Sequence, residues 1–284
     1  MSSKIIALVD GSIYSKSVCE HAAWVAARSG WSVELMHVLG RGDGSEKSDL
    51  SGSIALGARS ALLSELAELD AQRAKLVTHR GRAILEDARA ILDAAGVDEI
   101  TTRLRHGDIV DTVHEQEAGA EMVLIGKRGE AADFAKGHLG SNLERIVRSS
   151  RKPVFVASRA FRPITRVLLA FDGGPSSIRA VSYLAGSPLY AGLTVQVVTV
   201  GSPSAAVTKG LEDARAMLVA AGIEADTKVV SGTPDKALGD LVDEAGFDML
   251  VMGAYGHSRI RSLIIGSTTT EMVRSCKVPV LLVR

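Results

Sequence analysis

With 284 residues, the chain is long enough for two domains of ordinary size. Its 33 acidic and 33 basic residues give a formal net charge of zero, which argues against a nucleic-acid-binding or membrane-surface protein. No apolar run reaches the length of a membrane helix, and the first apolar stretch stops at Asp10, so no signal peptide is predicted. We therefore expect a cytoplasmic protein in which Cys19 and Cys276 are reduced thiols.

The first half opens with an apolar strand that ends at Asp10 and has a long additional stretch from about residue 40 to residue 96. That stretch begins with the polar, glycine-rich run Gly40–Ser48, which predicts a loop. It continues with leucines at helical spacing, which form one apolar stripe: Leu62, Leu66, Leu69 and Leu76. His79–Gly81 is a point at which this helical stretch could divide into two helices. Packing on its own sheet is the expected role, and a partner-binding or dimerising role is the alternative.

In the second half, short apolar runs alternate with helical stretches. Strands are predicted near 166–171, 193–200, 225–231, 248–253 and 279–283. Helices are predicted near 175–186, 204–221, 234–245 and 263–275. The strands lack polar alternation, as expected when helices cover both faces of a parallel sheet. The pattern predicts an α/β fold with a doubly wound, five-stranded parallel sheet flanked by helices.

The two halves repeat one another in the same order along the chain. The matching segments are Lys4–Gly11 with Arg166–Gly173, Glu117–Gly126 with Glu244–Gly253, Gly140–Ser141 with Gly266–Ser267, and Lys152–Val156 with Val278–Val283. Ordered self-similarity of this length indicates a duplicated domain. Asp10 and Asp172 are 162 positions apart, whereas Gly126 and Gly253 are 127 apart, so the first half carries the extra residues. We expect tandem domains at 1–158, with the helical insertion at about 40–96, and at 163–284.

A glycine-rich signature follows the fourth strand of the second half. Gly253–Gly256 comes directly after the apolar run Met249–Met252, and nine residues later Gly266–Thr268 opens the next predicted helix. Glycines allow close backbone approach to a ligand, and helix N-termini favour phosphate oxygens. In doubly wound sheets, ligands bind beyond the carboxyl ends of the strands, where Asp172 and Val200 also lie. The signature predicts a nucleotide phosphate site, and a merely tight strand-to-helix connection is the alternative.

This combination resembles the universal stress protein family in its tandem form, over essentially the whole chain. The resemblance implies that the protein binds ATP, ADP or AMP, with Mg²⁺ as an optional companion of the nucleotide. It also implies that the fifth strands, which pair across a dimer in family members, pair here within one chain as a pseudo-dimer. The implied nucleotide contacts of the second domain are Ala170, Asp172, Val200, Met252, Gly253, Gly256, Gly266, Ser267 and Thr268.

The first half departs from the signature, because ten residues separate Gly129 from Gly140 where the second half has nine. Glu130 and Asp133 lie in this interval and would oppose a triphosphate, an effect that Lys127, Arg128 and Lys136 could offset. The positions that still match the family pattern are Leu8, Asp10, Val38, Gly126, Gly129, Gly140, Ser141 and Asn142. We expect a weaker, altered or vestigial site in this half.

Catalytic motifs are missing from the sequence, which has neither a Gly-x-Ser-x-Gly elbow nor a P-loop. His114-Glu115 lacks the second histidine of a zinc helix, and no carboxylate beside His257 would orient it as a base. We therefore expect no catalytic or metal-ligating residues and interpret the chain as an ATP-binding regulatory protein of the stress response with an unknown protein partner. A slow ATP hydrolase and a nucleotide-independent scaffold that uses the helical insertion are the alternatives. Whether two chains form a homodimer is left open.

Overall fold

The structure is a computed structural model that describes residues 3–40, 56–129, 140–254 and 267–284. The elements of the first half are β1 (Lys4–Leu8), α1 (Ile13–Ser29), β2 (Ser32–Leu39), α2 (Leu56–Ala94), β3 (Ile100–His106), α3 (Ile109–Gln116), β4 (Ala120–Gly126), α4 (Ser141–Ser149) and β5 (Val154–Ala157). Those of the second half are β6 (Arg166–Ala170), α5 (Pro175–Gly186), β7 (Thr194–Val200), α6 (Ala205–Ala220), β8 (Glu224–Val230), α7 (Pro234–Glu244), β9 (Met249–Gly253), α8 (Ser267–Ser275) and β10 (Val280–Val283). The predicted alternation of strands and helices is confirmed.

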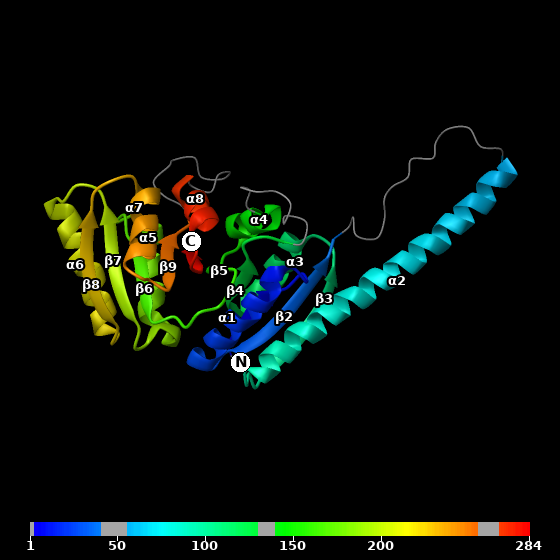
Figure 1. Cartoon of the computed structure of the whole chain (residues 1–284), viewed down its shortest axis with the longest axis horizontal. Helices are drawn as coiled ribbons and strands as arrows, with labels where there is room; N and C mark the ends of the chain where they lie inside the picture. The colour runs from blue at the N-terminus through cyan, green and yellow to red at the C-terminus, as the bar shows by residue number, and fades with distance from the viewer. Residues whose placement is uncertain (1–2, 41–55, 130–139, 255–266) are drawn as a thin grey trace.

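All ten strands form one sheet in the order β3-β2-β1-β4-β5-β10-β9-β6-β7-β8 (Figure 1). Within each half the neighbouring strands are parallel. The halves meet where β5 and β10 pair antiparallel, with Phe155 opposite Leu281. This pairing confirms the pseudo-dimer expected from the sequence, and each of the two strands covers an edge that would otherwise be exposed.

Successive strand residues point to opposite faces of the sheet, and each face has its own core. Ile5 of β1 belongs to a core that includes residues of α1, α2, α5 and α6. Its neighbour Ile6 belongs to a second core with residues of α3, α4, α7 and α8. Because helices cover both faces, the central strands β1, β4, β6 and β9 are largely apolar, as the sequence pattern predicted, whereas the edge strands β3 and β8 carry exposed polar residues.

Helix α2 is continuous from Leu56 to Ala94, so the predicted division at His79–Gly81 is wrong. Gly81 instead lets the helix pack tightly on side chains of the sheet, since a Cβ added there would lie 2.8 Å from Cδ1 of Leu104. From Leu85 onward α2 contributes buried residues to the core, whereas its N-terminal part extends away from the sheet (Figure 1). Most of the predicted loop Gly40–Ser48 lies outside the described residues.

Helix α2 is long but carries charged residues throughout its length. Among the described helices, none combines the length and the apolar character that crossing a membrane requires.

Candidate functional site

The candidate site of the second half lies at the carboxyl ends of β6, β7 and β9. Strand β6 has β7 on one side and β9 on the other, so the strand order reverses beside it. Ala170 and Val200 end β6 and β7, and Met252 is the next-to-last residue of β9. All three pack on the same face of the sheet, the one covered by α7 and α8. The fold therefore gathers three predicted contact residues at the place where doubly wound sheets bind ligands.

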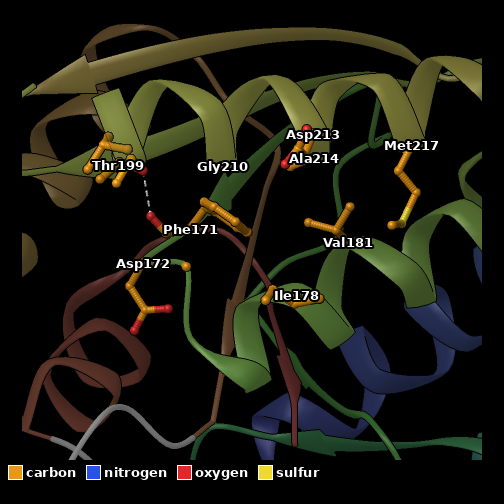
Figure 2. A pocket seen from close by; sticks show the side chains of 12 residues that line it. Phe171, Asp172, Ile178, Val181, Thr199, Gly210, Asp213, Ala214 and Met217 are labelled. Atoms are coloured by element: carbon orange, nitrogen blue, oxygen red, sulfur yellow. Dashed lines mark hydrogen bonds between the residues drawn. The ribbon is translucent and has the colours of Figure 1, made fainter. Parts of the chain in front are cut away.

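Asp172 lies two residues after the end of β6, and its carboxylate is fixed by the start of α5. Its Oδ1 accepts hydrogen bonds from the backbone N–H of Gly174 at 2.8 Å and from Oγ of Ser177 at 2.7 Å. An Asp that bonds the amide two residues on forms a local turn, which orients its side chain without a ligand. The carboxylate is turned away from Val181 and Met217, which lie between α5 and α6 (Figure 2).

Asp10 has the same arrangement in the first half. Its Oδ1 accepts from the N–H of Ser12 at 2.9 Å and from Oγ of Ser15 at 3.2 Å. The two halves thus present equivalent carboxylates at equivalent strand ends.

The glycines that end β4 and β9 are required by packing. A Cβ added at Gly253 would lie 2.7 Å from Cβ of Ser176, and one added at Gly126 would lie 2.6 Å from Cβ of Tyr14. Both distances are too short for real carbon atoms. Gly126 lets the end of β4 approach the first turn of α1, and Gly253 lets the end of β9 approach the first turn of α5. This requirement holds with or without a ligand.

In the first half the structure also brings the glycine loop beside the carboxylate. A Cβ added at Gly129 would lie 3.0 Å from Oδ2 of Asp10. Gly140 donates its N–H to the carbonyl of Lys127 at 3.4 Å, so the two described ends of the loop meet. Leu8 and Val38 pack on the same face as Ala170 and Val200. Ser141 begins α4, and Asn142 beside it is exposed.

Lys127 does not serve the first-half loop as the sequence suggested. Its side chain is buried, and Nζ donates to the carbonyl of Cys276 in the second half. Burial lowers the pKa of this amine. Lys127 therefore links the two halves rather than offsetting the acidic residues of the loop. Those residues, Glu130 and Asp133, lie outside the described residues together with Lys136.

The segment for which the sequence predicts phosphate contacts in the second half is described only in part. Gly256, His257 and Gly266 lie outside the described residues. Helix α8 begins at Ser267, with Thr268 next, so a helix N-terminus follows the glycine signature as predicted.

A cavity of about 430 Å³ between α5 and α6 was not anticipated from the sequence (Figure 2). Its walls are mostly apolar and come from the loop between β6 and α5, from β7, and from α5 and α6; they include Phe171, Asp172, Ile178, Val181, Gly210 and Met217. It lies on the opposite face of the sheet from Ala170, Val200 and Met252. The one signal in the sequence was Gly210, a glycine inside a predicted helix.

The fold and these strand-end sites define a tandem, doubly wound α/β protein with a glycine loop in each half. The family model that matches the chain is that of the universal stress protein family, over residues 1–158 and again over 163–284. Universal stress protein Slr1230 of Synechocystis sp. is 36% identical over 286 residues, which cover 99% of this chain and 99% of that protein. The chain belongs to the universal stress protein family, and both halves are domains of this kind.

Two solved structures extend the comparison. A universal stress protein from Archaeoglobus fulgidus covers 100% of this chain and 99% of its own, with a TM-score of 0.75 and 21% identity. It has the same fold over both halves. A universal stress protein solved in complex with cAMP covers 43% of this chain and 98% of its own, with 31% identity and a TM-score of 0.36.

Proposed function

We propose that the chain is a regulatory protein of the stress response that binds ATP, or ADP or AMP, mainly in its second half. The observation that carries the proposal is the carboxylate of Asp172, fixed by Gly174 and Ser177 at the end of β6. It stands where the strand order reverses between β6 and β9. A carboxylate held at that point is ready to accept hydrogen bonds from ribose hydroxyls or from the amino group of adenine.

The neighbouring strand ends suit the adenosine. Ala170 and Val200 are half-buried, and Met252 lies behind them at the end of β9. Together they offer an apolar surface on one face of the sheet, against which the flat face of a base can be buried. The requirement that Gly253 be small brings the end of β9 close to α5, and this supports a ribose position beside Asp172.

The N-terminus of α8 supports the position of the phosphates. The helix starts at Ser267 and runs for nine residues, so its first turn carries unpaired amides and the partial positive charge of the helix dipole. Thr268 in the same turn adds a hydroxyl. Gly256 and Gly266 belong to this part of the proposal on the sequence pattern alone. Mg²⁺ would accompany the nucleotide with phosphate oxygens and water as its ligands.

The regulatory interpretation is preferred to a dedicated enzyme because the groups at the strand ends bind rather than react. Asp172 is engaged by the start of α5, and the other strand-end residues are apolar. Nucleotide binding would change the surface around the start of α8, which a protein partner could then recognise. Slow ATP hydrolysis and a nucleotide-independent scaffold remain the competing functions.

The test compares two matched variants, Asp172→Asn and Asp10→Asn. Each keeps the side-chain volume and the Oδ1 acceptor that the local turn uses, but removes the negative charge. The freshly purified protein is assayed for released nucleotide by chromatography and then titrated with ATP by calorimetry. We expect about one nucleotide per chain and a loss of affinity of at least about tenfold in Asp172→Asn, since hydrogen bonds to charged groups contribute about 1.5–3 kcal/mol. Asp10→Asn should bind as the wild type does.

Other results would count against the proposal in distinct ways. Two nucleotides per chain, with equal losses in both variants, would show that the first half binds as well as the second. Metal-dependent turnover of ATP would favour the hydrolase. Failure of the wild-type chain to bind any adenine nucleotide would overturn the proposal and leave the scaffold. Gly266→Asp, which adds charge where phosphate is expected, should also abolish binding.

A further inference from the structure

The N-terminal part of α2 presents apolar side chains to solvent. From Leu63 to Arg80 its side chains are exposed or half-buried, and the helix becomes buried from Gly81 onward. Before that point Leu63, Leu69 and Leu76 are 54%, 54% and 69% exposed. This part of the helix extends well beyond the sheet (Figure 1). Most helical stability in proteins comes from packing of an apolar face, so such a helix gains from a partner that covers its leucines.

The leucines follow the spacing of a coiled-coil seam. Leu66, Leu69, Arg73 and Leu76 are separated by three, four and three residues, and Leu69 and Leu76 are one heptad apart. Side chains at this spacing lie along one stripe of a helix, which packs against the equivalent stripe of a second helix.

Charges along the same segment run from acidic to basic. Glu65, Glu68 and Asp70 precede the middle of the exposed segment, and Arg73 and Lys75 follow it, all five with exposed side chains. When two copies lie antiparallel, the acidic stretch of each faces the basic stretch of the other. A parallel pair would set like charges opposite one another, which is unfavourable.

The shape of the chain favours the same orientation. The sheet adjoins α2 only at the C-terminal end of the helix (Figure 1). In an antiparallel pair the two bodies therefore stand at opposite ends. The sheet edges at β5 and β10 already pair within the chain, so this route to dimerisation is occupied.

We infer that residues 63–80 of α2 form an antiparallel coiled coil with the same segment of a second copy of this chain. The stripe that contains Leu69 and Leu76 forms the contact, and the acidic and basic stretches set the direction. This self-association is independent of nucleotide binding.

Sedimentation equilibrium of the full-length chain tests the inference. The wild type should have a mass of about 60 kDa, twice the 29.9 kDa of one chain. The double variant Leu69→Ala/Leu76→Ala keeps good helix formers but loses the apolar contact, so its dimer dissociation constant should rise at least about tenfold. Val219→Ala removes a comparably exposed side chain, 48% exposed on α6, and should leave the mass unchanged.

A charge exchange guards against misfolding as an explanation. The variant Glu65→Lys/Glu68→Lys/Asp70→Lys carries only positive charges in this segment, and Arg73→Glu/Lys75→Glu carries mainly negative ones. Each alone should be monomeric because the two copies repel, whereas an equal mixture should form dimers. Formation of the mixed dimer would show that both variants are folded and that charge directs the pairing.

Cysteine cross-linking then fixes the direction. Gln72→Cys lies near the middle of the segment and should form an interchain disulfide on oxidation. His79→Cys lies on the same helical face one heptad later, so two copies are far apart in an antiparallel pair and should not cross-link. Equal cross-linking of both would indicate a parallel pair and contradict the proposed direction. A wild-type chain that stays at 29.9 kDa up to high concentration would overturn the inference and assign the stripe to a different protein.

Discussion

The two halves cover the same face of the sheet in the same way, yet a side chain of α2 fills the space near the β1–α1 turn, whereas a cavity opens at the corresponding place between α5 and α6. His37 Nδ1 donates to the carbonyl of Val9 at 2.7 Å, and 162 positions later Thr199 Oγ1 donates to the carbonyl of Phe171 at 2.7 Å. The backbone paths beneath α1/α2 and α5/α6 are therefore equivalent.

A single position accounts for much of the difference. The N–H of Val97 bonds Leu92 and that of Ile223 bonds Leu218 in the same manner, which aligns the ends of α2 and α6. Eight residues before these leucines stand Ile84 and Gly210. Ile84 reaches so close to the β1–α1 turn that a Cβ on Gly11 would lie 2.9 Å from its Cδ1. Gly210 has no side chain, and the cavity opens beside it. The duplication thus preserved the backbone while one side chain decided how the layer is filled.

The largest expected difference between the halves is in how much stability each loses at acidic pH. His21 on α1 is fully buried between Phe155 and Phe161, with ring centroids 5.3 and 5.1 Å away, and its Nδ1 donates to the carbonyl of Ser17. Burial lowers its pKa to about 4. At the equivalent position, 162 residues later, the second half has Tyr183, whose pKa burial raises.

The sign of the effect follows from proton uptake. Unfolded His21 has a pKa near 6.5, so between about pH 6.5 and 4 the unfolded state binds a proton that the folded state does not. Stability is complete above about pH 6.5 and should fall by about 3 kcal/mol as the pH drops to 4. Tyr183 does not titrate in this range, so the first half should unfold first.

The two tryptophans of the chain, Trp24 and Trp31, both lie in the first half and report on it alone. Urea unfolding followed by their fluorescence at pH 7 and pH 4.5 measures the effect. His21→Leu should remove most of the acid sensitivity, whereas His79→Gln, at an exposed position, should retain it. Equal acid sensitivity in His21→Leu and the wild type would contradict the assignment.

A second prediction concerns Ile84, which fills space in the layer formed by α1 and α2. Ile84→Ala removes the side chain that fills the space above Gly11 and should destabilise the first half by about 2 kcal/mol, near the lower end for core truncations because Ile84 is half-buried. The urea midpoint from tryptophan fluorescence provides the measurement. Ile13→Ala, at a side chain that is 50% exposed, should change it by no more than about 0.5 kcal/mol. Similar effects of the two substitutions would mean that Ile84 does not close the layer.

The sequence was informative about the elements because their signals are local. The apolar runs of β6, β7 and β9 are buried on both faces, so the absence of alternation identified them. The pairing of β5 with β10 was also predictable, since two equivalent apolar edges of a duplicated domain can satisfy one another.

What the sequence could not provide depends on distant neighbours. Gly81 was interpreted as a helix break from its poor intrinsic propensity, but its contact with Leu104, 23 positions away, explains it. Lys127 was interpreted as a loop charge, but its partner is Cys276. In the candidate site, the strand-end residues were predictable from topology, whereas the tight contact between Gly253 and Ser176 required coordinates.

The smallest expected effect comes from partly filling the cavity beside Gly210 in the second half. Gly210 lies inside α6, and a Cβ there would stand 3.4 Å from Cε1 of Phe171, an ordinary contact with the cavity wall. Gly239 lies inside α7 and would meet nothing within 4 Å. Gly239→Ala therefore reports helix propensity alone, a gain of up to about 1 kcal/mol. Gly210→Ala should add a few tenths of a kcal/mol from the new contact with the ring.

Because the gain from helix propensity is common to both variants, the difference between their unfolding free energies measures the effect of the new contact in the cavity. Urea unfolding followed by circular dichroism of the full chain gives both values. If Gly210→Ala stabilises the chain more than Gly239→Ala does, the space beside Gly210 accepts a methyl group without strain. Side chains at position 210 can then fill the cavity stepwise, as Ile84 fills the corresponding space in the first half. If Gly210→Ala is the less stable of the two, the ring of Phe171 cannot move to make room for the added methyl group. The cavity would then depend on the rigid ring of Phe171 as well as on the missing side chain of Gly210.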